Sequence, residues 1–158
     1  MKPASGKDEM VNASAINDGA AVLAESAPVQ ALGLKPLARL VGYAHAGVEP
    51  AYMGIGPGAG DAQGAAARRP EGRQHGRDRV EQDLRCAGLG DDPGAGPRPG
   101  QVTPNGLGIS LGHPVCATGA IVTVKAIADL HRISGHHALV TMCIGGGQGI
   151  AAIFQRCV

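Results

Sequence analysis

The sequence has no excess of charge of either sign, because 14 Lys and Arg face 13 Asp and Glu and the formal net charge is +1. No electrostatic argument therefore favours nucleic acid or an anionic membrane surface as a partner. The amino end lacks an apolar segment of the secretory kind, and no run approaches the roughly 18 apolar residues that a membrane-spanning helix needs. We therefore expect no secretion, no membrane insertion, and neither nucleic acid nor a membrane as partner.

Cysteine is scarce and irregularly spaced. The four cysteines have neither the paired spacing of a disulfide framework nor the CxxC motif of a metal site. This pattern indicates a reducing, cytoplasmic setting. No metal site is expected, since the adjacent His136 and His137 point in different directions on a strand or turn. A length of 158 residues suits one compact domain rather than two.

Short apolar runs separated by turn residues predict an α/β layered domain. A short helix is expected from Ser26, as its N-cap, to Gly33, as its C-cap. Apolar residues at near-helical spacing predict a longer helix over residues 117–131. The last two expected strands are apolar on both faces, as buried strands are. Strands are expected at residues 20–24, 37–44, 138–144 and 149–154.

Residues 58–101 differ in composition from the rest of the chain. They hold ten glycines and seven of the ten arginines, but only three large aliphatic residues. So little apolar surface cannot offset the entropy cost of ordering the segment, and an irregular, flexible linker is expected. An RNA-binding segment is less favoured, because seven acidic residues balance the seven arginines and no aromatic side chain is present to stack on bases.

Two glycine-flanked side chains in the last third of the chain are candidates for chemistry. His113 stands between Gly112 and Pro114, and Pro114 can open a helix at its first turn, which places the imidazole near a helix N-terminus. Cys143 follows an apolar run and precedes three glycines, whose backbone can turn tightly toward a ligand. Together they offer a base, a thiol acid/base and an oxyanion site. A hydrogen-bonded turn histidine and a buried core cysteine are the alternatives without a chemical role.

The motifs GHPVCATG and MCIGGGQGIAAIF resemble the C-terminal signatures of thiolases, and NASAINDGAA and LKPLARLVGYAHAGVEPAYMGIGP resemble further stretches of that family. The resemblance covers residues 2–57 and 102–158, most of the C-terminal half. It implies a mixed β-sheet with flanking helices, interrupted at about residues 58–101. It also implies acyl transfer between acyl-CoA thioesters, by Claisen condensation or thiolytic cleavage of the acetyl-CoA acetyltransferase type. Coenzyme A thioesters are then substrates, no tightly bound cofactor is expected, and full-length members are expected to form homo-oligomers.

The resemblance also assigns roles to individual residues. His113 matches the histidine that activates the nucleophilic cysteine and helps to bind the thioester oxygen. Cys143 matches the acid/base cysteine that removes a proton from the α-carbon of acetyl-CoA and protonates leaving coenzyme A. The backbone amide of Gly145 helps to form an oxyanion hole. Ser14 matches a serine that lies against the pantetheine arm of coenzyme A, and Met53 a methionine that borders the acyl pocket.

The chain also departs from the family pattern. Cys116 stands where thiolases usually carry glycine, and we expect its side chain to crowd the packing at the helix start and to perturb His113. The family's N-terminal half, with its nucleophilic cysteine, and the asparagine of its NEAF motif have no counterpart here. The isolated chain is therefore expected to lack thiolase turnover. The alternatives are an inactive fragment that docks on an intact thiolase subunit, and a ketosynthase-like condensing enzyme, which a cysteine heading the glycine run disfavours.

A further hypothesis concerns the coding DNA of residues 58–101. If its codons are rich in G and C and are read one base later, they can spell text such as VIESNKTFAAQAL, which is similar to the NEAF segment of thiolases. We therefore consider a frameshifted stretch bounded by two compensating single-base changes. Codons that cannot be shifted into such a segment would rule this out.

Overall fold

The computed structural model describes residues 14–56, 77–80, 106 and 108–157. In this part of the chain, four strands form one sheet in the order β1-β4-β3-β2. β4 pairs antiparallel with both β1 and β3, and the short β2 runs parallel to β3, so the sheet is mixed as expected. The strands are β1 (Ala38–Gly47), β2 (Arg77–Val80), β3 (His137–Ile144) and β4 (Gln148–Arg156).

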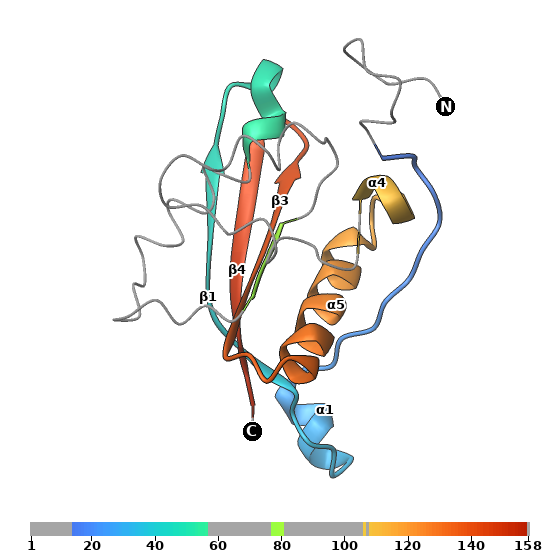
Figure 1. Ribbon diagram of the computed structural model, residues 1–158, viewed down its shortest axis with the longest axis vertical. Coiled ribbons are helices and arrows are strands. Elements are labelled where there is room, and N and C mark those ends of the chain that lie inside the picture. Colours follow the sequence, from blue (N-terminus) through green and yellow to red (C-terminus); the bar gives the residue numbers. More distant parts are fainter. Residues whose placement is uncertain (1–13, 57–76, 81–105, 107, 158) are drawn as a thin grey trace.

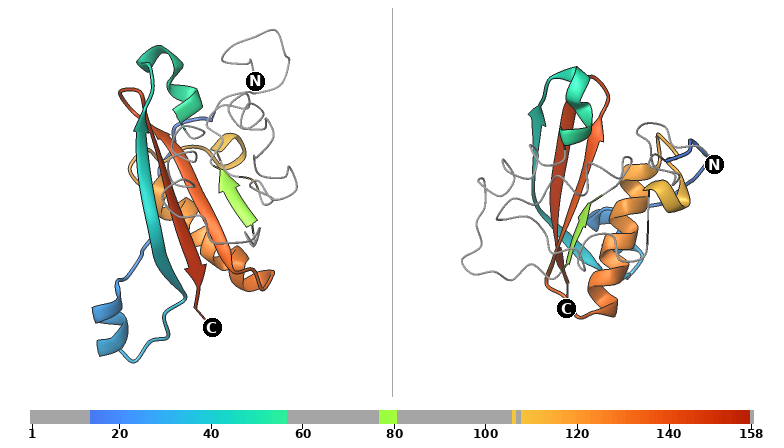
Figure 2. Two further views of the ribbon diagram at one scale, coloured as in Figure 1. Left: turned by 90° about the vertical axis from the view of Figure 1, so that its left-hand side faces the viewer. Right: turned by 45° about the horizontal axis from the view of Figure 1, so that its top comes forward.

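Helix α5 (Thr118–Arg132) lies along one face of the sheet (Figures 1 and 2). Val122, Ala126 and Leu130 recur every fourth residue, so they share one face of the helix. They pack on Ala138 and Val140 of β3, and the five residues form a buried hydrophobic cluster. The predicted helix over residues 117–131 is thus confirmed, with its ends shifted by one residue.

Three shorter helices complete the described elements: α1 (Ser26–Ala31), the 3₁₀ helix η1 (Pro50–Ile55) and α4 (Gly108–Leu111). The N-cap of α1 is Glu25, so Ser26 begins the helix rather than capping it. Gly33 follows the C-cap with φ of +63°. The expected short helix is therefore confirmed, with each end displaced by one residue.

The strand expected at residues 20–24 is wrong, because these residues form neither helix nor strand. They belong to an extended connection that passes alongside α5 toward α1 (Figure 1). Val22 is 88% exposed, so no neighbouring strand of the described chain covers it. A run of small apolar residues predicts a strand only where a partner strand is available, and here the sheet lies elsewhere.

The other three expected strands are confirmed as β1, β3 and β4, but β3 and β4 are not buried on both faces. Buried residues in both strands alternate with half-buried ones along most of their length. The cause is that, among the described residues, helix α5 packs on one face of this sheet and no described helix packs along the other. β3 and β4 therefore carry more apolar side chains than the described part of the chain buries.

One strand lies inside the segment expected to be irregular. Arg77–Val80 pair with Ala138–Thr141 of β3 as the parallel edge strand β2. Backbone pairing at a sheet edge needs few apolar side chains, so composition did not reveal it. The remaining residues of the 58–101 segment lie outside the described chain. No helix in the described ranges is both long and apolar enough to cross a membrane.

Candidate functional site

His113 lies in a loop between α4 and α5. Backbone contacts with a distant segment of the chain hold this loop in place. Gly112 has φ of +86°, a conformation that favours glycine. The backbone N–H of His113 donates to the carbonyl of Ala15 at 2.7 Å, and Ile16 forms a parallel bridge with His113. The loop is therefore fixed by a segment nearly a hundred positions earlier in the sequence.

We call residues 14–19 the N-terminal strap. Further contacts between this strap and the His113 loop come from the side chain of Asn17 and from Gly19. The Nδ2 atom of Asn17 donates to the carbonyl of Leu111 at 2.8 Å. A Cβ placed on Gly112 would lie only 2.7 Å from the same Asn17 amide, so there is no room for a side chain at this position. Gly19 lies so close to Pro114 that a Cβ there would approach its Cγ to 2.8 Å. Ser14 is half-buried at the beginning of the strap, beside the Ala15 contact.

The His113 ring is held by the first turn of α5. Its Nδ1 atom lies 2.8 Å from Oγ1 of Thr118, the first residue of the helix. The expectation that Pro114 opens the helix is wrong by four residues. The carbonyl of Pro114 instead accepts from the N–H groups of Ala117 and Thr118, at 2.7 and 3.0 Å, in a turn that precedes the helix. The imidazole is nevertheless placed at the amino end of α5.

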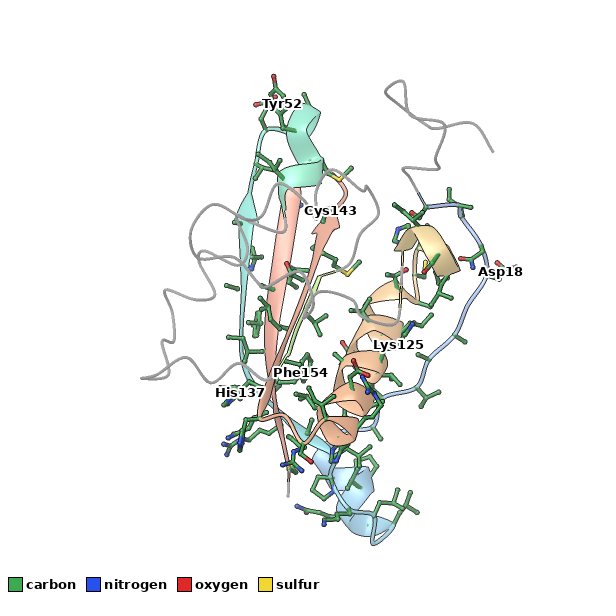
Figure 3. All side chains as sticks on the ribbon, in the orientation of Figure 1. Asp18, Tyr52, Lys125, His137, Cys143 and Phe154 are labelled. Atoms are coloured by element: carbon green, nitrogen blue, oxygen red, sulfur yellow. The ribbon has the colours of Figure 1, made fainter. Side chains whose placement is uncertain are left out.

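Cys143 is half-buried near the carboxyl end of β3, where Figure 3 labels it. It pairs with Gly149 across the turn of the β3–β4 hairpin. Glycine is required here because another segment approaches closely: a Cβ on Gly149 would overlap the carbonyl of Gly56. Likewise a Cβ on Gly147 would overlap the carbonyl of Val48, whose N–H donates to the carbonyl of Gly147 at 2.7 Å.

Gly145 is different from these two glycines. It is exposed, its φ is not in the left-handed region, and no described atom lies within 4 Å of a Cβ placed on it. Packing of the described chain therefore does not require glycine at this position. A glycine that packing does not require, next to Cys143, is consistent with a backbone amide left open to a ligand.

Met53 belongs to η1, which contacts both strands of the hairpin. The approach of Gly56 to Gly149 fixes the end of η1 against the beginning of β4. Met53 itself is half-buried. The structure thus gathers Met53, Cys143 and Gly145 around the hairpin turn.

The residues around His113 and the residues around Cys143 lie at the same end of the fold. The amino end of α5 and the carboxyl end of β3 point the same way in Figure 1. Met142 of β3 lies against the first turn of α5. A Cβ placed on Gly119 would be 3.7 Å from the Sδ atom of Met142. Met142 precedes Cys143, and Gly119 follows Thr118, which holds His113. The strap and loop with Ser14 and His113 therefore face the same end as the hairpin with Cys143.

Cys116 does not crowd the helix start. It is an exposed free thiol in the turn before α5. The expected perturbation of His113 by this side chain therefore has no support in the structure. Cys143 and Cys157 are not in disulfide bonds either.

Sequence reasoning missed Asn17 and Thr118. Both stand inside the recognised motifs, three residues after Ser14 and five after His113. A hydroxyl residue one turn beyond a histidine, at the start of an apolar helix pattern, is the signal that points to Thr118. The contact of Asn17 joins residues 94 positions apart, so no local pattern indicates it.

No group of three or more His, Cys, Asp or Glu within the described ranges could hold a metal ion. One histidine contact away from the site is structural. Nε2 of His131 lies 2.9 Å from the carbonyl of Leu37 and ties the end of α5 to the beginning of β1.

Comparison with solved structures defines the fold as thiolase-like. The chain superimposes on the crystal structure of the Bacillus anthracis acetyl-CoA acetyltransferase with a TM-score of 0.79 and 34% sequence identity. The match covers 92% of this chain and 38% of that one.

Sequence comparison agrees. The family model "Thiolase, C-terminal domain" matches residues 86–156. The beta-ketothiolase BktB of Cupriavidus necator is 52% identical over 155 residues, 92% of this chain and 37% of the relative. The 3-oxoadipyl-CoA/3-oxo-5,6-dehydrosuberyl-CoA thiolase of Escherichia coli is 43% identical, with the same shares covered. The chain belongs to the thiolase family and corresponds to its C-terminal part, and it spans well under half the length of these relatives.

Proposed function

We propose that this chain supplies the C-terminal share of an acyltransferase site that exchanges acyl groups between coenzyme A thioesters. The observation that carries the proposal is the convergence of the His113 loop and the Cys143 hairpin at one end of the fold. A histidine beside the helix and a cysteine on the sheet, both at the same end of the fold, can act on the two substrates of one reaction.

In this scheme His113 accepts the proton of a nucleophilic thiol, and the resulting thiolate attacks the first thioester. The carbon–sulfur bond to coenzyme A breaks, and Cys143 protonates the leaving coenzyme A thiolate. Cys143, as a thiolate, removes a proton from the α-carbon of the second acyl-CoA. The resulting carbanion forms the new carbon–carbon bond and the acyl–sulfur bond to the nucleophile breaks. The N–H of Gly145 stabilises the enolate oxygen. The nucleophile itself has no counterpart in this sequence.

Ser14 and Met53 are proposed to contact the substrate. Ser14, in the strap beside His113, suits the pantetheine arm, and Met53, beside the hairpin turn, suits the acyl group. The names 3-oxoadipyl-CoA/3-oxo-5,6-dehydrosuberyl-CoA thiolase and acetyl-CoA acetyltransferase state different acyl groups, each carried on coenzyme A. We propose the acetyl-CoA acetyltransferase type, in the cytoplasm, with coenzyme A thioesters as substrates and no tightly bound cofactor.

The isolated chain is proposed to be inactive and to need the rest of a thiolase. Leu40 and Tyr43 are 52% and 67% exposed on β1, the edge strand of the sheet. Exposed apolar side chains on a sheet edge favour association with another surface. The alternative, an inactive fragment docked on a thiolase subunit, rests on the same exposed surface.

A half-reaction separates these two proposals. The chain is purified alone and together with the amino-terminal part of the Cupriavidus necator beta-ketothiolase, and each sample receives acetyl-CoA in D₂O. Cys143-dependent exchange of the methyl protons, followed by mass spectrometry, is expected only in the two-part complex. Cys143→Ala should abolish the exchange, whereas Cys116→Ala, which removes an exposed thiol, should leave it unchanged.

Other outcomes are equally informative. A complex that forms but shows no exchange would support the inactive fragment. Exchange by the isolated chain, lost on Cys143→Ala, would overturn the requirement for a partner. Size-exclusion chromatography of both samples reports on association, including the homo-oligomer expected for the family.

A further inference from the structure

Thr118 makes two polar contacts with its single hydroxyl group. Oγ1 lies 2.8 Å from Nδ1 of His113 and 3.1 Å from the carbonyl oxygen of Pro114. The side chain is 2% exposed, so water does not compete for either contact. Its position is fixed because Thr118 is the first residue of α5 and its N–H also bonds to the Pro114 carbonyl.

The number of protons available indicates which atom donates in each of these two contacts. A hydroxyl carries one proton and a carbonyl oxygen carries none, so two oxygens 3.1 Å apart attract only when the hydroxyl proton lies between them. Thr118 then donates to Pro114, and its oxygen is left as an acceptor. In this arrangement His113 donates from Nδ1–H to the Thr118 oxygen. The opposite arrangement, with Thr118 donating to Nδ1, would leave two buried lone-pair oxygens facing each other.

We propose that Thr118 is a positioning residue that holds neutral His113 in the Nδ1–H tautomer, so that proton transfer takes place at Nε2. This assignment deepens the proposed function and rests on it for its catalytic consequence. The Nδ1–H bond to Thr118 persists when Nε2 takes up a proton, because both nitrogens of imidazolium are donors. The ring therefore needs no reorientation between its two protonation states.

The same helix contains a matched control. Thr123 is also buried, at 7% exposure, and its Oγ1 donates to the carbonyl of Gly119 at 2.8 Å, the same four-residue back-bond. In the described part of the chain this hydroxyl bonds to the Gly119 carbonyl and not to a histidine, so its loss should affect helix stability without affecting the tautomer.

The test is NMR of ¹⁵N-histidine-labelled full-length chain, at a pH well above the ordinary histidine range. Wild type should show His113 with a protonated, pyrrole-type Nδ1 and a pyridine-type Nε2. Thr118→Val should shift the ring toward the Nε2–H tautomer, while Thr118→Ser and Thr123→Val should retain the wild-type pattern. An Nε2–H tautomer in wild type, or an unchanged Nδ1–H tautomer in Thr118→Val, would overturn the proposal.

Wild type and Thr118→Ser decide the question even if Thr118→Val fails to fold. In the two-part complex, Thr118→Val should reduce the rate of acylation by roughly 10²-fold, with Thr118→Ser close to wild type. A wild-type Nδ1–H tautomer in a complex without activity would leave the tautomer assignment standing and count against the proposed function alone.

Discussion

The His113 loop and the Cys143 hairpin are held in place by different means. The loop is held by hydrogen bonds to the strap, in which the His113 N–H donates to the Ala15 carbonyl and the Asn17 amide donates to the Leu111 carbonyl. The hairpin is held by close approach of backbone to backbone, where Gly147 and Gly149 leave no room for a side chain. The first arrangement depends on polar contacts that net about 1 kcal/mol each, and the second on steric fit.

The comparison indicates how each region should tolerate change. A backbone carbonyl cannot move aside as a flexible side chain can, so substitutions in the hairpin should cost more than substitutions in the loop. The hairpin also contains Gly145, which packing does not require. It therefore offers a substitution with little structural cost beside two with a large one.

The largest effect is expected for Gly149→Ala. Its new methyl group would overlap the carbonyl of Gly56 and separate η1 from β4. We expect a loss of about 3 kcal/mol in the free energy of unfolding, measured by urea denaturation. A loss below about 0.5 kcal/mol would show that close approach does not fix the hairpin.

Gly112→Ala should have the next largest effect. It combines a positive φ with a clash against the Asn17 amide, and about 2 kcal/mol of destabilisation is expected in the same denaturation experiment. The double variant with Asn17→Ala separates the two causes. It removes the clash and leaves the backbone strain, so the two changes should be less than additive. Strict additivity would contradict the contact.

Asn17→Ala alone should cost less, about 1 kcal/mol, since it removes one exposed hydrogen bond to Leu111. Its local effect should be larger than its global one. Hydrogen exchange of the His113 amide, which bonds to Ala15, should accelerate while amides of β3 and β4 are unaffected. Uniform acceleration over the whole chain would mean that the strap stabilises the fold rather than the loop.

The sequence reveals these two regions unequally. Apolar periodicity located α5, β3 and β4 to within one or two residues, because each pattern records the face that packs in the core. The glycine motifs located the His113 and Cys143 turns. Contacts between distant segments, such as Asn17 with Leu111 and Gly56 with Gly149, leave no local periodicity and appear only in the folded chain.

Composition misled the interpretation in two places. Residues 20–24 have the small apolar residues of a strand but pass beside α5 without a strand partner. Arg77–Val80 lie in a stretch poor in apolar residues yet pair with β3. In both cases strand formation depends on an available neighbouring edge, which is a property of the whole sheet.

The smallest structural effect is expected for Gly145→Ala, and this makes it the most informative substitution. A Cβ at Gly145 meets no described atom within 4 Å, so the free energy of unfolding should change by less than about 0.5 kcal/mol. In the two-part complex, the same methyl group would stand beside the amide proposed to bind the enolate oxygen. Deuterium exchange into acetyl-CoA should therefore fall by roughly 10²-fold. Val124→Ala, a truncation of a side chain 38% exposed on α5, is the control that leaves exchange unchanged. If Gly145→Ala destabilises the chain as much as Gly149→Ala does, glycine at 145 serves packing, and the oxyanion role loses its structural support.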